Sequence, residues 1–370
     1  MRNVLISGAG VAGSALAYWL RRNGFSVTVV ERAPQLRSGG QAVDIRGAAL
    51  DVIDQMGLGE QARAARTRMR GMTMLDGQGN ELFRSEEHTL SAGRLDSEDI
   101  ELLREDLGAM LFEKATDAHA EYVFGDSITA LRQEEHGVVA QFEHGGFRTF
   151  DLVIGADGMH SAVRRLAFGP EAQFVSHLGK YLAIFPAPNF LGLDNWQVWF
   201  QDFATETGGG IYPVRENSEL RVTLGFGSEP IEYDYRDTAW QKQAVRDRLG
   251  GLGWEAPKLL ELMAGAPDFY FDAMAQVKMD TWSQGRVTLV GDAAYCASPL
   301  SGQGTSLALA GAYVLAAELG RAGATHEEAL AAYEERMRPF VALNQALATE
   351  NPAGPASEES VERAKNAIEL

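Results

Sequence analysis

The hydrophobic pattern at the start of the chain alternates between short apolar runs and one amphipathic stretch. Residues 3–7 and 26–30 are short, rich in β-branched residues and bounded by turn residues, which is typical of buried parallel strands. Residues 13–24 between them have helical spacing and end at Gly24, a common helix stop. We therefore predict a β–α–β unit with a right-handed crossover.

The middle of the chain changes pattern. Helical periodicity over 100–119 is followed by a predicted strand meander over 121–143 and a buried strand over 151–158. Between about 175 and 275, apolar and polar residues alternate as in antiparallel strands, with Trp and Phe among them. We therefore predict that this region forms a separate sheet.

The buried-strand pattern returns at 284–294, and a long helix is predicted over 304–323. Residues 327–370 are mostly helical, with a break at 351–357. The order predicts an α/β chain (α+β overall), in which an antiparallel sheet domain interrupts a Rossmann-like nucleotide-binding domain and a helix ends the chain. We expect a discontinuous nucleotide-binding domain of residues 1–72, 94–175 and 276–345, a sheet domain of 73–93 and 176–275, and a C-terminal helical segment of 346–370.

Composition narrows the possible partners. The 370 residues include 33 Lys and Arg against 51 Asp and Glu, a net charge of −18, which disfavours nucleic acid and anionic membranes as partners. Cys296 is the single cysteine and the seven histidines show no metal-ligand spacing, so we expect neither a disulfide framework nor a bound metal. Without a recognisable leader or a span of roughly 20 apolar residues, we expect a cytoplasmic protein.

The first motif is Gly8-x-Gly10-x-x-Gly13, placed between the first predicted strand and the first helix. Its glycines allow a tight turn and close approach to a pyrophosphate, which the helix N-terminus can bind. Glu31, 18 residues after Gly13, can accept hydrogen bonds from ribose hydroxyls. The motif predicts a dinucleotide site but does not separate NAD from FAD.

Two later motifs follow predicted buried strands. In the first, Asp157 and Gly158 form a turn in which Ser161 can cap a short helix, a pattern that also fits an ordinary strand–turn–helix. In the second, Asp292 ends a strand, where a buried charge needs a polar partner such as a ribityl hydroxyl. The turn 299–304 then opens a helix whose N-terminus can stabilise negative charge on a reduced flavin, a pattern that also fits the simple cap of a core helix.

Together, in this order and spacing, the motifs resemble those of the class A FAD-dependent aromatic hydroxylases, flavoprotein monooxygenases of the para-hydroxybenzoate hydroxylase type. The chain is most similar to the short branch with the tetracycline-inactivating and polyketide-tailoring enzymes. The resemblance covers nearly the whole chain. It implies an FAD-binding domain interrupted by a substrate-binding sheet domain.

The resemblance also implies roles for individual residues. Gly8, Gly10, Gly13 and Glu31 would hold the ADP half of FAD, with Arg32 as the second member of an acid–arginine pair. The further cofactor contacts that it implies are Asp44 and Arg46 in the flavin loop 36–47, Arg104, Asp157 (also for NADPH) and Asp292, with Arg37 as an NADPH contact. The loop that it places along the flavin consists of Pro299, Leu300, Ser301, Gly302, Gln303 and Gly304.

The chain departs from the family pattern at four positions. Tyr295 replaces the histidine often found after GDAA, and Ser306, Ala308 and Gly311 replace the usual Asn, Gly and Asp. These changes affect side-chain contacts near the helix after the flavin loop, whereas contacts to the backbone at the helix terminus are unaffected.

The activity implied is hydroxylation of an aromatic or polycyclic, polyketide-like small molecule with NAD(P)H and O₂, through a flavin C4a-hydroperoxide. The cofactor carries this reaction, which agrees with the lack of an obvious general base. We expect a monomer or weak homodimer. An FAD-dependent reductase or dehydrogenase, or a Baeyer–Villiger oxygenase, fits the same motifs, and an FAD-retaining ligand-binding protein is the alternative from another class.

Overall fold

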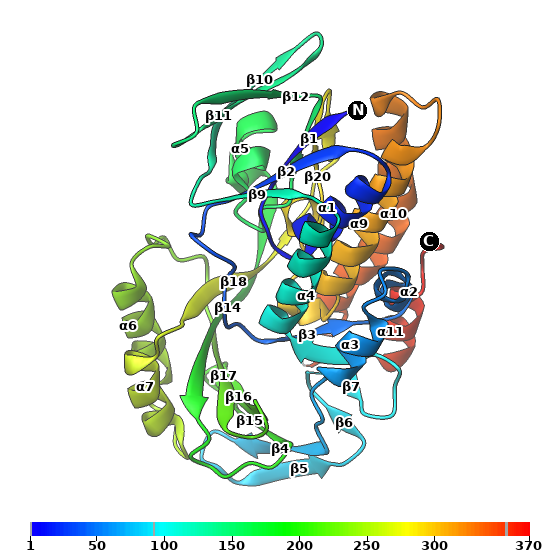
Figure 1. Ribbon diagram of the computed structural model, residues 1–370. Coiled ribbons are helices and arrows are strands. Elements are labelled where there is room, and N and C mark those ends of the chain that lie inside the picture. Colours follow the sequence, from blue (N-terminus) through cyan, green and yellow to red (C-terminus); the bar gives the residue numbers. More distant parts are fainter. Residues whose placement is uncertain (1, 92, 352–353) are drawn as a thin grey trace.

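Two large β-sheets organise the computed structural model, which describes residues 2–91, 93–351 and 354–370 (Figure 1). The six-stranded sheet has the order β19-β20-β13-β1-β2-β9 and is parallel except for β19. Its strands are β1 (Asn3–Ser7), β2 (Ser26–Glu31), β9 (Glu121–Phe124), β13 (Leu152–Gly155), β19 (Ser283–Gln284) and β20 (Val287–Leu289). The α/β fold and the initial β–α–β unit are confirmed, because α1 (Val11–Arg22) joins β1 to the parallel β2.

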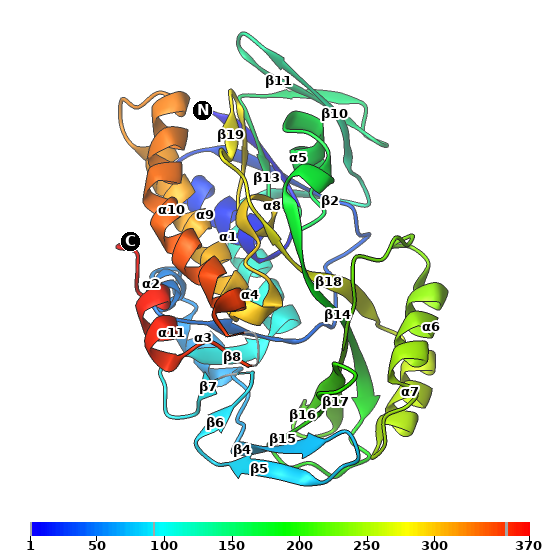
Figure 2. The same cartoon turned by 180° about the vertical axis from the view of Figure 1, so that it is seen from behind.

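Helices cover the six-stranded sheet on one side and a small sheet covers the other (Figures 1 and 2). The helical side contains α1, α4 (Arg104–Asp117), α9 (Gly304–Gly320) and α10 (His326–Glu350). The opposite side carries α5 (Ala162–Ala167) and the three-stranded sheet of β10 (Ile128–Glu134), β11 (Gly137–Phe142) and β12 (Phe147–Phe150). The apolar faces of these elements form the larger hydrophobic core.

The seven-stranded sheet has the order β18-β14-β17-β16-β15-β4-β5, and one face is covered by α6 (Thr238–Leu249) and α7 (Ala256–Gly265) (Figure 1). It is antiparallel except where β15 pairs parallel with β4. Its strands are β4 (Gly71–Asp76), β5 (Glu81–Ser85), β14 (Val175–Pro188), β15 (Trp196–Asp202), β16 (Thr207–Val214), β17 (Glu219–Gly227) and β18 (Tyr270–Val277). The antiparallel character expected for 175–275 is confirmed, and the helices α6 and α7 add to it.

Shorter elements connect the two sheets. The pair β3 (Ala42–Ile45) and β8 (Ile100–Leu103) lies between them, together with α2 (Ala48–Gln55), α3 (Gly59–Ala64), and the pair β6 (His88–Thr89) and β7 (Gly93–Arg94). The remaining elements are α8 (Asp292–Tyr295), α11 (Glu358–Lys365) and the 3₁₀ turns η1 (Glu171–Gln173) and η2 (Pro299–Ser301).

Three expectations are corrected. The helix predicted over 100–119 begins only at Arg104, because the buried residues 100–103 pair with β3 as strand β8. The predicted meander over 121–143 is divided, since β9 joins the parallel sheet beside β2. Of the strand expected over 284–294, only Gln284 (in β19) and Val287–Leu289 (β20) lie in strands, and Gly291, with φ +64°, starts a new turn.

The C-terminal helices pack against the rest of the fold. The predicted break at 351–357 falls between α10 and α11, and residues 352–353 within it lie outside the described residues. Lys365 Nζ lies 3.1 Å from Asp99 Oδ2, and Asn344 Nδ2 donates to the Ala364 carbonyl at 3.0 Å. No helix of the described chain has the length and apolar character needed to cross a membrane. The domain boundaries expected from the sequence stay a prediction.

Candidate active site

The first glycine motif forms a turn that packs tightly on its inner side. Gly8 has φ +104°, and a Cβ on it would lie 2.9 Å from Asp157 Cα and overlap the Ala156 carbonyl. A Cβ on Gly13 would overlap the Gly8 carbonyl. Gly10 is exposed, and no described atom lies within 4 Å of its Cβ position. No side chain of the described chain caps α1, so its first N–H groups are free to bind a pyrophosphate.

Glu31 and Arg32 follow the second strand. Glu31 Oε2 accepts from the Ala9 N–H at 3.0 Å, and Oε1 accepts from the Ala33 N–H at 2.8 Å. The carboxylate is therefore held beside the glycine turn, where a ribose would follow the pyrophosphate. Arg32 is exposed, and its guanidinium carbon lies 5.9 Å from the ring centre of Tyr235.

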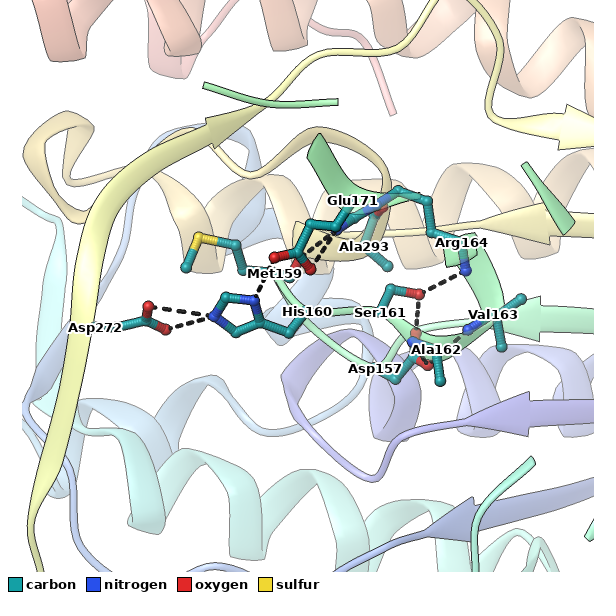
Figure 3. Close-up of polar contacts among 10 residues, drawn as sticks. All are labelled: Asp157, Met159, His160, Ser161, Ala162, Val163, Arg164, Glu171, Asp272 and Ala293. Atoms are coloured by element: carbon teal, nitrogen blue, oxygen red, sulfur yellow. Dashed lines mark hydrogen bonds and ion pairs between the residues drawn. The ribbon is translucent and has the colours of Figure 1, made fainter. Parts of the chain in front are cut away.

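The second motif is held by hydrogen bonds within its own turn (Figure 3). The Asp157 carboxylate accepts from the Ser161 hydroxyl and, at 2.9 and 3.2 Å, from the Ala162 and Val163 N–H groups. Ser161 Oγ accepts from the Arg164 N–H at 2.9 Å, which confirms the predicted cap of α5. Burial raises the pKa of Asp157. The Asp157 side chain thus shapes the turn that packs against Gly8.

The third motif lies at the N-terminus of α9. Asp292 is exposed although Gly291 and residues 293–298 are buried, and desolvation by the surrounding protein raises the pKa of its carboxyl group. Asp292 Oδ1 lies 3.9 Å from the Cβ position of Gly304, so this acid faces the predicted flavin loop. Within that loop Pro299 and Leu300 are exposed, Ser301 is buried and Gly302 adopts φ +63°.

Asp44 and Arg46 lie against the same loop. Arg46 Nη2 is 2.9 Å from Asp44 Oδ2 and 3.7 Å from the Cβ position of Gly302. Burial raises the pKa of Asp44 to about 7, although the Arg46 charge opposes this shift. The Arg46 N–H donates to Ser306 Oγ at 3.0 Å, so Ser306, one of the departures from the family pattern, anchors the loop 36–47.

The two remaining arginines differ in position. Arg104 Nη2 donates to the Gly39 carbonyl at 3.3 Å, and a Cβ on Gly40 would lie 2.6 Å from Arg104 Nε. Arg104 therefore supports the loop 36–47. Arg37, the predicted NADPH contact, is exposed.

Several buried polar atoms around the loop 299–304 have no hydrogen-bond partner within the described chain. Gln303 is fully buried, and within the described chain neither of its amide atoms has a hydrogen-bond partner. Asp44 Oδ1 and Arg46 Nε are also unsatisfied there. Buried polar atoms normally find partners, so these atoms point to a polar ligand. Together with the open glycine turn and the uncapped α9 N-terminus, they fit FAD.

Sequence reasoning missed residues that join the seven-stranded sheet to the loop 36–47. Tyr212 Oη accepts from the Ala42 N–H at 2.8 Å. Arg221 Nε donates to the Gly40 carbonyl at 2.8 Å, and its Nη2 lies 3.1 Å from Glu105 Oε1. No motif surrounds these residues, and only their alternation in a predicted strand could have marked them.

Two departures from the family pattern form one packing arrangement. A Cβ on Gly311 would overlap the Tyr295 hydroxyl, which accepts from Tyr333 Oη at 3.0 Å. Tyr295 is buried, and its hydroxyl fills the space that a side chain at position 311 would need. The large side chain of Tyr295 therefore requires a glycine at position 311.

The parallel sheet, the glycine turn and the unsatisfied polar atoms define a dinucleotide-binding oxidoreductase. A family model described as an FAD binding domain matches residues 1–347. A flavin-dependent monooxygenase from an unknown prokaryotic organism is 42% identical over 346 residues, which cover 94% of this chain and 88% of the relative. The chain belongs to the flavin-dependent monooxygenases, with FAD as its cofactor.

Other similar proteins match over the full length. An uncharacterised protein of Mycobacterium tuberculosis is 51% identical over 372 residues, covering 100% of this chain and 99% of its own. The crystal structure of the tetracycline destructase Tet(51) superposes with a TM-score of 0.88 at 36% identity, covering 100% of this chain and 99% of that one.

Proposed function

We propose that this enzyme uses NAD(P)H and O₂ to hydroxylate an aromatic or polycyclic, polyketide-like small molecule. The observation that carries the proposal is the face of the seven-stranded sheet opposite α6 and α7. Trp199 on β15 is half-buried there, and a Cβ on Gly210, its neighbour on β16, would overlap the indole ring. Gly210 thus lets the Trp199 indole lie flat against β16, and the part of this indole that stays exposed can stack on a flat ring.

Hydrogen bonds connect this face of the sheet to Arg46 in the loop 36–47. Trp199 Nε1 donates to Gln197 Oε1 at 2.9 Å, and Gln197 Nε2 donates to Ser91 Oγ at 2.6 Å. Arg46 Nη2 donates to the Ser91 carbonyl at 3.0 Å. A substrate stacked on Trp199 would therefore lie on the side of the sheet that faces Arg46 and Gln303.

FAD, when bound, supplies the oxygen-activating chemistry, and the chain's own residues position and enclose the reactants. Trp199 would orient the ring, while Gly210 and Gln197 would hold Trp199 in place. The α9 N-terminus would stabilise negative charge at the cofactor, since its first N–H groups have no side-chain cap in the described chain.

Two further observations support a small polycyclic substrate. Tet(51) is a tetracycline destructase, and its fold matches this chain over the full length. The net charge of −18 supports an uncharged or cationic small molecule over nucleic acid. We include in the proposal a cytoplasmic location and a monomer or weak homodimer.

The test is a screen of the purified holoenzyme with phenols, naphthols and tetracycline for compounds that accelerate NADPH oxidation, followed by ¹⁸O₂ labelling of the product. We expect one ¹⁸O atom in a new hydroxyl group. An ¹⁸O atom in a ring-expanded lactone would indicate a Baeyer–Villiger reaction, and a product without ¹⁸O would indicate a reductase. No stimulation by any aromatic compound would contradict the proposal.

A pair of variants tests the location. W199A should raise KM for the stimulating compound about tenfold, because an aromatic contact of about 1.4 kcal/mol is lost. F203A is the control, since Phe203 is 63% exposed at the end of the same strand. Equal effects of the two substitutions would place the substrate elsewhere.

A further inference from the structure

The imidazole of His160 lies between two carboxylates from distant parts of the chain (Figure 3). Its Nδ1 is 2.9 Å from Glu171 Oε1, and its Nε2 is 3.1 Å from Asp272 Oδ2. His160 follows β13, Glu171 begins η1, and Asp272 lies on β18. Only the imidazolium donates from both ring nitrogens, so this arrangement selects the charged form.

The surroundings of His160 favour the same form. The hydrogen bond to Asp272, followed by that to Glu171, raises the pKa of His160 to about 10, while desolvation opposes the shift. Asp272 is only 8% exposed and also accepts from Tyr270 Oη at 3.1 Å. The titratable and charged groups around the cluster are Asp272 and Tyr270 on β18, Glu171 on η1, Arg164 and Arg165 on α5, and Tyr233.

On one side, hydrogen bonds connect the cluster of His160, Glu171 and Asp272 to the turns of Asp157 and Asp292. Arg164 is fully buried, and its Nη2 lies 3.3 Å from Glu171 Oε2. Its Nη1 donates at 2.9 Å to the carbonyl of Ala293, the residue after Asp292 (Figure 3). The backbone of Arg164 also donates to Ser161, in the turn of Asp157.

The other side of the cluster is the edge of the seven-stranded sheet. Asp272 lies on β18, which ends the sheet beside β14. The Ala273 N–H donates to Asp272 Oδ1 at 2.8 Å, so the acid is anchored in its own strand. His160 is therefore one link between that strand and the turns of Asp157 and Asp292, in addition to hydrogen bonds such as that from the Val277 N–H to the Cys296 carbonyl at 3.1 Å.

We propose that His160 is a positioning residue: its imidazolium, bound by Asp272 and Glu171, holds the edge of the seven-stranded sheet against the two later FAD motifs and thereby slows release of FAD. The inference rests on FAD as the cofactor and does not depend on the identity of the organic substrate. It assigns no contact between His160 and FAD.

The experiment measures FAD release from the holoenzyme as the recovery of free-flavin fluorescence after dilution. H160Q removes the charge, and H160R keeps a charge with several donors. At pH 7.5 we expect release about tenfold faster for H160Q and within about threefold of wild type for H160R, because charge-assisted hydrogen bonds are the stronger kind. H136Q is the control, since His136 is 88% exposed beside Glu135.

A double-mutant cycle with Asp272, the hydrogen-bond partner of His160, distinguishes a positioning role from a general loss of stability. D272N should speed release as H160Q does, and the double variant should add little, because both substitutions break the same link. Deuterium exchange should accelerate in both 157–172 and 270–277 in either variant. If H160Q does not fold, D272N with the same two measurements decides the question.

The pH dependence gives a further test. Since the pKa is raised from 6.5 to about 10, the stabilisation from His160 is complete below pH 6.5 and is lost as the pH rises through about 10. In the folded holoenzyme itself, however, His160 stays an imidazolium until the pH approaches about 10, so wild-type FAD release should stay constant from pH 6 to 8.5. A wild-type rate that rises with a midpoint near 6.5, H160R as fast as H160Q, or wild-type retention of FAD in H160Q would each overturn the proposal.

Discussion

The three glycines of the first motif serve different purposes. Gly8 and Gly13 are required by the protein's own packing, since a side chain at either position would overlap backbone atoms. Gly10 has an ordinary backbone conformation, with φ −76°, and faces open space in the described chain. A methyl group at Gly10 would therefore contact no described protein atom, and we predict that it would meet the bound cofactor.

This difference predicts opposite outcomes for two alanine substitutions. G10A should change the free energy of unfolding of the FAD-free protein by less than about 0.5 kcal/mol, yet weaken FAD binding at least about tenfold. G13A should lower the unfolding free energy by about 2 kcal/mol or more, because the backbone must move. Urea unfolding and FAD titration measure the two quantities.

G108A is the control, because Gly108 lies within α4 with no described atom within 4 Å of its Cβ position. It should stabilise the protein by about 0.5–1 kcal/mol and leave FAD affinity unchanged. Normal FAD binding by G10A would show that the pyrophosphate does not lie at Gly10.

The protonation of Asp44 predicts a pH-dependent stability of the FAD-free protein. Burial raises its pKa from 3.8 to about 7, so the folded state holds a proton that the unfolded chain has released between these values. The stabilisation is present below pH 3.8 and is lost as the pH rises through 7. D44N, neutral throughout, should be more stable than wild type by about 1–3 kcal/mol at pH 8, but not at pH 4.

Urea unfolding at several pH values measures this difference. D54N is the control, because Asp54 is exposed and its pKa is lowered by the hydrogen bond from Arg63. Its small effect should stay constant between pH 5 and 8. A constant difference between D44N and wild type over the same range would show that Asp44 is ionised throughout.

At the level of elements, patterns confined to one segment predicted the structure well. β1, α1, β2 and α9 each carry a complete hydrophobic pattern and a terminating residue within their own length. Residues 100–103 form a strand only because β3 pairs with them, so their helical periodicity was misleading. The predicted helical stretch therefore began four residues too early.

The candidate site was likewise predictable where a motif lies within one segment of the sequence. Asp44, Arg46 and residues 299–304 were found through the family motifs, and the structure brings them together. Tyr212 contacts Ala42 across 170 positions of sequence, and His160 contacts Asp272 across 112. Such pairings arise from the packing of the two sheets, and a single sequence carries no local signal of them.

The packing of α8 against α9 predicts a compensating pair of substitutions. G311A should lower the free energy of unfolding by about 2–3 kcal/mol, because its methyl group overlaps the Tyr295 hydroxyl. Y295F removes that hydroxyl together with its hydrogen bond to Tyr333, so alone it should cost about 1 kcal/mol. In the Y295F background G311A should cost clearly less.

Thermal or urea unfolding of the four proteins in this cycle provides the measurement. A308G, at a buried neighbouring position in α9, is the control and should cost the same with Tyr295 or Phe at 295. Strict additivity of Y295F and G311A would mean that the backbone of α9, and not the hydroxyl, absorbs the methyl group.

For the whole molecule, the net charge of −18 predicts a dependence on salt. Excess like charge destabilises a compact state, and this repulsion is screened when the Debye length falls below about 10 Å. Raising NaCl from 20 to 300 mM should raise Tm by about 2–5 °C, with KCl giving the same shift. A lower Tm at high salt would show that surface ion pairs outweigh the repulsion.

The order of strands also determines when the enzyme is completed on the ribosome. The six-stranded sheet needs β20, which pairs with β13 more than 130 residues earlier in the sequence. The loop 299–304 and α9 are synthesised later still. The last strand of the seven-stranded sheet ends at Val277, so that sheet has all its strands before β20 is synthesised. During translation the interrupting sheet can therefore fold first, and the enzyme acquires its cofactor only near the end of its synthesis.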